Sequence, residues 1–135
     1  MRLFILCSDT REKADLEHKT EKVLLVPGEK IAKIMNYGWP MVLAHPIFFP
    51  SEANALLGSI KFAIEEFHPE EIVSVGHDCG YYKMIPHLAN TSLFDKKRDI
   101  LHIHRMLTRR YPNQVFKSLF DVSDGKDFRF ETISV

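Results

Sequence analysis

The two cysteines of the chain stand in short polar segments that each follow a largely apolar run. Cys7 comes directly after the run 3–6, and Cys79 comes shortly after the run 72–75, with His77 two positions before it. Cysteine sulfur and histidine nitrogen are ligands that zinc prefers in proteins. The residue types therefore predict a zinc centre in which Cys7, His77 and Cys79 are the metal ligands.

Asp9 and Arg11 follow the first cysteine at alternate positions. A zinc ion with three protein ligands keeps its fourth position for water and lowers the pKa of that water, so hydroxide forms near neutral pH. Asp9 can take the fourth position and close the site, or it can stand back and accept a hydrogen bond from the bound water. Arg11 is a natural partner for Asp9, because its planar guanidinium can hold both carboxylate oxygens and keep them ionised. The orientation of Asp9 therefore decides whether the centre is open.

Simpler interpretations of these residues stay open at the level of sequence. Either cysteine can be a buried apolar thiol, and His77 can be a turn residue bonded to backbone. Asp9 and Arg11 can form an ordinary surface ion pair, which contributes only about 0–1 kcal/mol.

The other histidines are weaker candidates for a metal ligand. His45 and His87 each neighbour a proline and are alternatives to His77. His102 and His104 lie two positions apart in an expected helix. Their side chains would diverge there by roughly 200° and would not converge on one ion.

The composition is that of an ordinary globular protein and excludes several classes of partner. The chain has 135 residues, 45% hydrophobic and 27% charged, which suits a single domain over residues 1–135. The 18 basic residues balance 18 acidic ones, so no net charge attracts nucleic acid or an anionic membrane. No apolar run is long enough for a signal peptide or a membrane span, which predicts a cytosolic location. In a reducing compartment the two cysteines are expected as thiols or metal ligands.

The hydrophobic pattern predicts alternating strands and helices. Apolar runs at 2–7, 22–26 and 71–75 are typical of buried strands, and 29–37 is interpreted as a short helix. The proline-containing segment 38–50 is harder to assign, and its residues 41–44 are interpreted as extended. The clearest helix begins after Ser51, the expected N-cap, and ends before Pro69.

The end of the chain predicts a second long helix and an antiparallel edge. The helix covers 95–110, and strands over 115–122 and 128–135 flank an Asp124-Gly125 turn. The whole pattern predicts an α/β fold whose central sheet is mostly parallel and flanked by helices. In such a sheet, sites form at the carboxyl ends of strands. Cys7 and Cys79 are therefore expected to be neighbours, although 72 positions separate them.

The two cysteine segments resemble the zinc-binding motifs of the β-class carbonic anhydrases. That family carries Cys-x-Asp-x-Arg after its first strand, and Cys7, Asp9 and Arg11 match it residue for residue. A second family motif, usually Gly-His-x-x-Cys-Gly, follows a strand that comes after a long helix, and the segment 76–80 resembles it. The similarity of motifs covers roughly residues 3–11 and 56–83.

The second segment is one residue shorter than the family motif. Only one residue separates His77 from Cys79, where the family has two. Zinc–ligand distances are about 2.0–2.3 Å, whereas one residue of chain can span about 3.3–3.6 Å. His77 must therefore reach the metal along a different backbone path, or it does not reach the metal.

The resemblance implies a fold, a cofactor and an activity. It implies a β-carbonic anhydrase-like domain with bound Zn²⁺ that hydrates carbon dioxide reversibly to bicarbonate, through zinc-bound hydroxide. Asp9 would orient the hydroxide and Arg11 would fix Asp9. It also implies a homodimer with its sites near the subunit interface, for which the apolar stretch 41–49 is suited. We expect the substrate pocket to be narrow and apolar.

Two alternatives to this activity stay open. The same centre could hydrolyse a related small electrophile such as carbonyl sulfide. The shortened second motif also suits a non-catalytic relative, which has a structural zinc ion or an empty site and binds a partner or a small anion.

Overall fold

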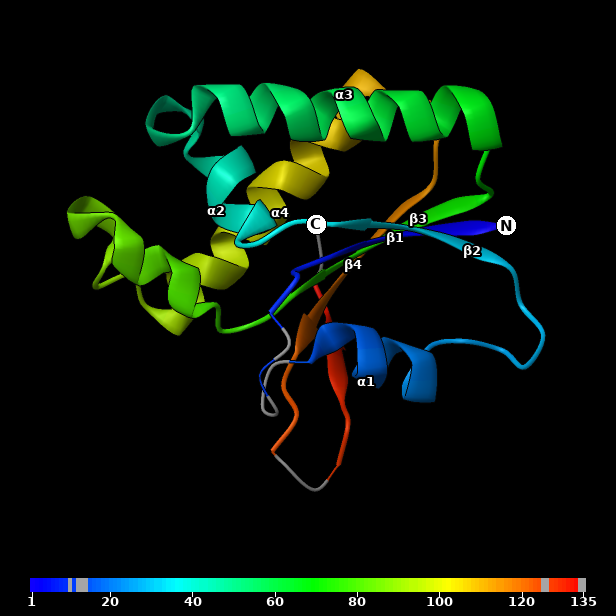
Figure 1. Cartoon of the computed structure of the whole chain (residues 1–135), viewed down its shortest axis with the longest axis horizontal. Helices are drawn as coiled ribbons and strands as arrows, with labels where there is room; N and C mark the ends of the chain where they lie inside the picture. The colour runs from blue at the N-terminus through cyan, green and yellow to red at the C-terminus, as the bar shows by residue number, and fades with distance from the viewer. Residues whose placement is uncertain (10, 12–14, 125–126, 134–135) are drawn as a thin grey trace.

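A computed structural model describes residues 1–9, 11, 15–124 and 127–133. In these residues, strands form one sheet in the order β2-β1-β3-β4-β5 (Figure 1). The strands are β1 (Arg2–Leu6), β2 (Ile31–Met35), β3 (Glu71–Gly76), β4 (Phe116–Asp121) and β5 (Phe130–Thr132). The first four are parallel, and β5 runs antiparallel to β4 at one edge. The predicted fold class is confirmed.

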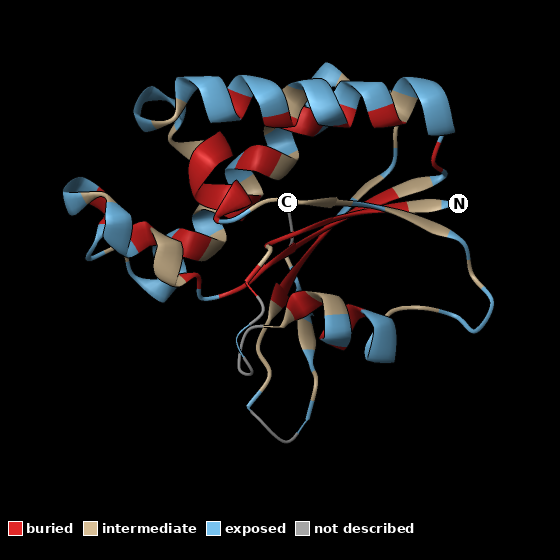
Figure 2. Ribbon diagram, in the orientation of Figure 1, coloured by how far each residue is buried: buried red, intermediate tan, exposed pale blue. Residues whose placement is uncertain are grey.

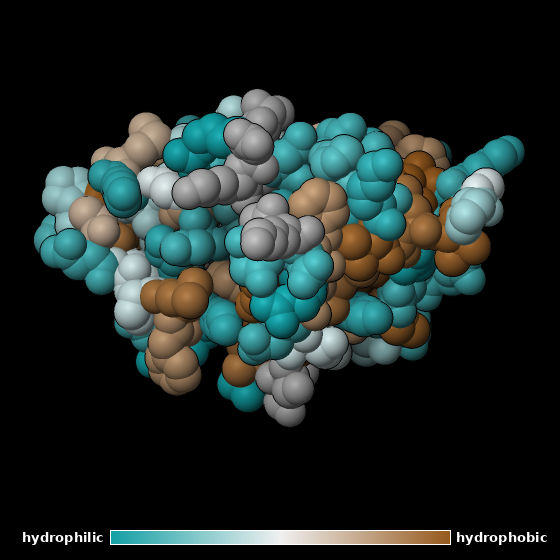
Figure 3. Space-filling model, turned by 90° about the horizontal axis from the view of Figure 1, so that it is seen from below, coloured by the Kyte–Doolittle hydropathy of each residue, from teal (hydrophilic) through white to brown (hydrophobic). Residues whose placement is uncertain are grey.

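Helices cover both faces of the sheet unequally. In the described part of the chain, only α1 (Leu16–Val23) lies on one face, and α2, α3 and α4 lie on the other (Figure 1). The bounds of the other helices are α2 (Trp39–Ala44), α3 (Pro50–Phe67) and α4 (Leu93–Arg110), with the short 3₁₀ helices η1 (Pro46–Phe48), η2 (Gly80–Met84) and η3 (Pro86–Leu88). Figure 3 shows the α1 side, where hydrophobic side chains gather at the surface among hydrophilic ones. None of these described helices is long and apolar enough to cross a membrane.

The core lies between the central strands and the three helices above them. Figure 2 shows buried residues along β1 and β3 and on the helix surfaces that face the sheet. Residues 3–6 of β1 are at most 1% exposed, because layers of structure cover both faces of this strand. Gly76, the last residue of β3, lies so close to α4 that a Cβ there would overlap the side chain of Ile100.

The helix α3 forms as predicted but begins one residue earlier than Ser51. Pro50 occupies its first turn, where the fixed φ of proline suits a helix and its missing N–H is not needed. The predicted N-cap at Ser51 is therefore wrong, since Phe49 holds that position. The helix ends at Phe67, and the next residue, His68, is its C-cap with a left-handed φ of 45°.

The segments 22–26 and 29–37 do not have the structures predicted for them. Asp15 caps α1 by accepting a hydrogen bond from the backbone N–H of His18 at 3.1 Å, and this helix continues through Val23. The predicted strand at 22–26 is therefore wrong. The predicted helix at 29–37 is also wrong, because Ile31–Met35 forms the edge strand β2, for which β-branched isoleucines are suited.

The segment 38–50 is helical and not extended. Gly38 has a φ of 60°, and a Cβ there would overlap the ring of Tyr81, so this position requires glycine. Trp39 then begins α2, and its Nε1 donates a hydrogen bond to the carbonyl oxygen of Val75 at 3.1 Å. The extended structure predicted for 41–44 is wrong, because a proline in the first turn favours the helix and its apolar side chains are buried there.

The antiparallel pair of strands predicted at the carboxyl-terminal edge of the sheet is confirmed. In the antiparallel pairing of β4 and β5, Phe120 lies opposite Glu131. The predicted turn includes Asp124, but its Gly125 lies outside the described residues, as do 134–135.

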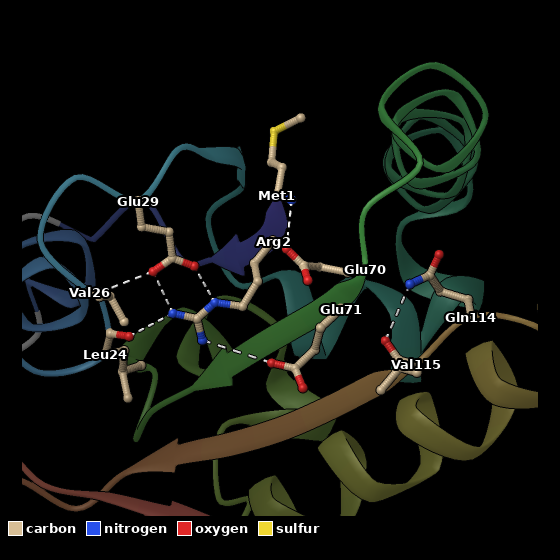
Figure 4. A network of polar contacts seen from close by, with 9 residues as sticks. All are labelled: Met1, Arg2, Leu24, Val26, Glu29, Glu70, Glu71, Gln114 and Val115. Carbon is tan, nitrogen blue, oxygen red and sulfur yellow. Dashed lines mark hydrogen bonds and ion pairs between the residues drawn. The ribbon is translucent and has the colours of Figure 1, made fainter.

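Arg2 anchors the edge of the sheet at which the parallel strands begin (Figure 4). Its Nη2 donates hydrogen bonds to Oε2 of Glu29 at 2.7 Å and to the carbonyl oxygen of Leu24 at 2.8 Å. The hydrogen bond from Arg2, more than one from the backbone N–H of Val26, lowers the pKa of Glu29 to about 2. This network ties the loop before β2 to β1, at the edge opposite the cysteines.

Candidate metal centre

The carboxyl ends of β1 and β3 bring the two cysteines together. These strands are parallel neighbours with Ile5 paired to Ser74, so the residues that follow them leave the sheet at the same edge. Cys7 and Cys79 are each 1% exposed, and their Sγ atoms lie 4.0 Å apart. The expectation that these two loops are neighbours is confirmed.

His77 completes a group of three donor residues. It directly follows the last residue of β3 and is 5% exposed. One ligand atom from each of Cys7, His77 and Cys79 lies within 4.8 Å of the others, which is the only such group in the described residues. A tetrahedral zinc ion with Zn–S bonds of about 2.3 Å holds two sulfurs roughly 3.8 Å apart. The shortened spacing of His77 and Cys79 therefore does not prevent the three donors from meeting.

The imidazole of His77 has one buried nitrogen that lacks a hydrogen-bond partner in the described part of the chain. Its Nε2 is buried and has no hydrogen-bond partner among the described residues. A buried polar atom without a partner costs about 1–3 kcal/mol. Because this atom belongs to a residue of the Cys-His-Cys group, the residues present fit a borderline cation such as zinc.

The pKa values of the two thiols are shifted in opposite directions. The hydrogen bond with Cys79 is the main cause that holds the pKa of Cys7 well below its ordinary value, and the neighbouring His77 adds to this effect. The backbone N–H of Gly38 also donates to Cys7 Sγ, at 3.4 Å. The same contact between the sulfurs, together with burial, raises the pKa of Cys79. The pair therefore favours one thiolate and one thiol, and a cation would be needed to remove the second proton.

Asp9 faces Arg11 and does not belong to the three-donor group. Arg11 Nε lies 2.9 Å from Oδ1 and 3.0 Å from Oδ2 of Asp9, and the Arg11 backbone N–H donates to Oδ1 at 3.1 Å. The Asp9 side chain is 7% exposed and that of Arg11 70%, so Asp9 is not part of a surface ion pair of the ordinary kind. Its hydrogen bonds with Arg11 hold the pKa of Asp9 below its usual range. Of the two orientations considered for Asp9, the structure has the one that leaves the centre open.

A pocket of about 300 Å³ opens beside the centre. It is lined by Asp9, Arg11, Tyr37, Cys79, Gly80, Tyr81 and Met84. The rings of Tyr37 and Tyr81 stack with their centroids 6.2 Å apart. The lining mixes charged, aromatic and thioether groups, so the expectation of a narrow apolar pocket is wrong.

Sequence reasoning missed Tyr37 as a pocket residue. It follows β2, and the interpretation of 29–37 as a helix hid the fact that a third strand ends at this edge of the sheet. Tyr81 directly follows the segment 76–80. A strand assignment for residues 31–35 would have placed Tyr37 beside the two cysteine loops.

The alternative histidines lie outside the three-donor group. Nε2 of His45 is 3.0 Å from Oδ2 of Asp99, and His87 stacks on Phe48. Nδ1 of His104 lies 2.7 Å from the hydroxyl oxygen of Ser118. His45 and His87 are therefore not needed as substitutes for His77.

Comparisons with known proteins identify no family for the chain. No protein-family model matches the sequence, and a comparison with curated proteins gives no match. The function of the centre is therefore inferred from its own donor atoms, charges and pocket.

Proposed function

We propose that the chain is a zinc-dependent lyase that catalyses the reversible hydration of carbon dioxide. One observation supports this most strongly: three buried zinc-type donors meet beside a carboxylate that is turned away from them and held by an arginine. A purely structural zinc site usually has four protein ligands, whereas a catalytic one keeps a position for water. The orientation of Asp9 leaves that position available.

Cys7, His77 and Cys79 would hold the ion with two thiolates and one neutral nitrogen. Bound zinc supplies Lewis acidity, which lowers the pKa of a water molecule and provides a nucleophile near neutral pH. Burial of the three donors, none more than 5% exposed, keeps competing water away from them.

Asp9 acts in this proposal as an oriented hydrogen-bond acceptor. Its carboxylate is ionised, because Arg11 lowers its pKa, and an ionised carboxylate accepts but does not donate hydrogen bonds. Arg11 fixes its direction through both oxygens. Asp9 can therefore orient the O–H of a nucleophile without competing for the ion.

The pocket also has room for a second candidate substrate. At about 300 Å³ it exceeds the space that carbon dioxide or any other three-atom molecule needs, and it is only partly apolar. A related small electrophile such as carbonyl sulfide would have room in the same place. Attack on its carbon would use the same residues in the same roles.

Stopped-flow assays of the zinc-loaded chain with carbon dioxide and carbonyl sulfide test both candidates. We expect hydration of carbon dioxide well above the buffer rate, and we expect Asp9→Asn to keep its zinc but lose about 10–100-fold in turnover. Asp95→Asn is the matched control, because Asp95 also pairs with an arginine but is 51% exposed and lies in α4. A zinc-loaded chain that accelerates neither reaction would contradict the proposal.

We also infer that the chain forms a homodimer in the cytosol. Met41, Val42 and Leu43 of the stretch 41–49 are buried in the core of the protein itself, whereas Ile47 in η1 is 84% exposed. An apolar side chain this exposed beside Phe48, which is 39% exposed, is suited to a subunit contact. Light scattering should show a dimer that Ile47→Asp weakens, and a wild-type monomer at high concentration would contradict it.

A further inference from the structure

We propose that Cys7 and Cys79 are also an oxidation site for small hydroperoxides, and that they form a disulfide when no metal ion holds them. The inference concerns regulation of the centre, and its metal-dependent part rests on the proposed function. The formation of the disulfide itself depends only on the two sulfurs and their surroundings.

The geometry favours this pair over any other product of thiol oxidation. The Sγ atoms are 4.0 Å apart, and a disulfide bond is about 2.05 Å long, so the sulfurs must approach by about 2 Å. The chain has 2 cysteines in total, so each is the only partner in the chain for the other. Both are 1% exposed, which hinders a disulfide between two molecules.

The pocket determines which sulfur reacts first. Cys79 lines the 300 Å³ pocket, whereas Cys7 does not. A molecule as small as hydrogen peroxide can therefore reach Cys79 through the pocket. Cys7 lies behind it and is placed to react with the oxidised sulfur.

The reaction balances with one peroxide for each pair of thiols. The Cys79 sulfur attacks one peroxide oxygen while its proton passes to the Cys7 sulfur, 4.0 Å away, and the O–O bond breaks. The leaving hydroxide takes a proton from solvent and departs as the first water. The Cys7 sulfur then attacks the Cys79 sulfenic acid, the S–S bond forms, the S–O bond breaks, and a second water leaves. The two sulfurs lose two electrons, and the peroxide is reduced to two water molecules.

Disulfide formation and metal binding exclude each other at this centre. Zinc is bound by thiolates, and a sulfur atom in a disulfide is not a thiolate. Of the three donors only His77 would remain, which is too few for a tight site. Zinc should therefore protect the thiols, and a dithiol reductant should restore the capacity to bind it.

The experiment counts free thiols in the full chain after treatment with hydrogen peroxide, with and without bound zinc. The protein is denatured, alkylated and digested without reductant, and the peptides that contain Cys7 and Cys79 are identified by mass spectrometry. We expect the metal-free chain to lose both free thiols and yield one cross-linked peptide pair. The zinc-loaded chain should keep both thiols over the same time.

Single variants separate this reaction from general oxidation. In Cys7→Ser, Cys79 should be oxidised without any cross-link, and in Cys79→Ser, Cys7 should react more slowly because it does not line the pocket. Irreversible oxidation of Cys79 in the wild-type chain, or a disulfide between two chains, would overturn the proposal. Equal loss of thiols with and without zinc would overturn its metal-dependent part. A chain that forms the cross-link but binds no zinc would support the oxidation site and contradict the proposed function.

Discussion

Replacement of Gly76 by alanine tests how tightly β3 and α4 pack beneath the candidate zinc centre. The new Cβ would overlap Cδ1 of Ile100 and lie 3.4 Å from Cδ2 of Phe120. Both neighbours are only 1% exposed, so neither side chain can turn into solvent. Overpacking of this kind costs about 1–3 kcal/mol of stability. Because His77 follows directly, we also expect the variant to bind zinc more weakly.

Trp39 provides the assay for this prediction. It is the only tryptophan of the chain and is fully buried, and its indole N–H donates to Val75, the residue before Gly76. Its fluorescence should therefore change when β3 separates from α2. Urea unfolding followed at this residue gives the free energy of unfolding of each variant.

Two further variants make the test of Gly76 specific. Ile100→Val removes the Cδ1 atom that the new Cβ would meet and should alone cost about 0.5–1.5 kcal/mol. The double variant should cost less than the sum of the two single costs, with a coupling energy of about 1 kcal/mol, because the atom that remains nearest the new Cβ is Cγ1 at 3.1 Å. Gly58→Ala is the control in α3, where no atom of the described residues outside the local helix lies within 4 Å of the new Cβ, and it should stabilise the protein by about 0.5–1 kcal/mol. Simple addition of the costs of Gly76→Ala and Ile100→Val would refute this reasoning.

Three other variants test the site, the acid sensitivity and a buried ion pair. Cys79→Ser should abolish tight zinc binding in a chelator competition assay, and full zinc occupancy in this variant would contradict the ligand assignment. The folded-state pKa of Glu29, about 2, lies below its ordinary value of 4.5, so its contribution to stability is present above pH 4.5 and is lost as the pH falls toward 2. Glu29→Gln should remove this contribution, so urea midpoints of the variant should fall less between pH 5 and 3; equal slopes would contradict it. Asp121 binds Lys19 at 2.6 Å with both side chains at most 6% exposed, so Asp121→Asn should cost about 1.5–3 kcal/mol in urea unfolding, because a buried hydrogen bond between charged groups is weakened. A cost below about 1 kcal/mol would show that water reaches this pair.

The sequence was sufficient to predict the strands that carry the cysteines. β1 and β3 are buried on both faces, so their runs are nearly all apolar, and Ser74 of β3 is small and buried. The long helix between them has enough turns for its apolar face to be recognised. The meeting of Cys7 and Cys79 followed from the parallel arrangement of these elements alone.

The short elements between β1 and α3 could not be predicted in the same way. Ile31 and Ile34 lie three positions apart, which suits a helix, but they also suit an edge strand with both faces partly covered. The run 22–26 is apolar, yet its start belongs to a helix that is determined by the cap at Asp15. Pairing with β1 makes residues 31–35 a strand, and the hydrogen bond to the Asp15 cap makes residues 22–23 part of a helix. The position of Tyr37 in the pocket follows from the strand.

The donors of the centre come from opposite halves of the chain, and this has a consequence for its biosynthesis. A nascent chain leaves the ribosome amino terminus first, so Cys7 emerges long before His77 and Cys79. One thiol cannot retain zinc, and the ion can be captured only after β3 has docked beside β1. Uptake of a metal ion should therefore mark the docking of β3 beside β1.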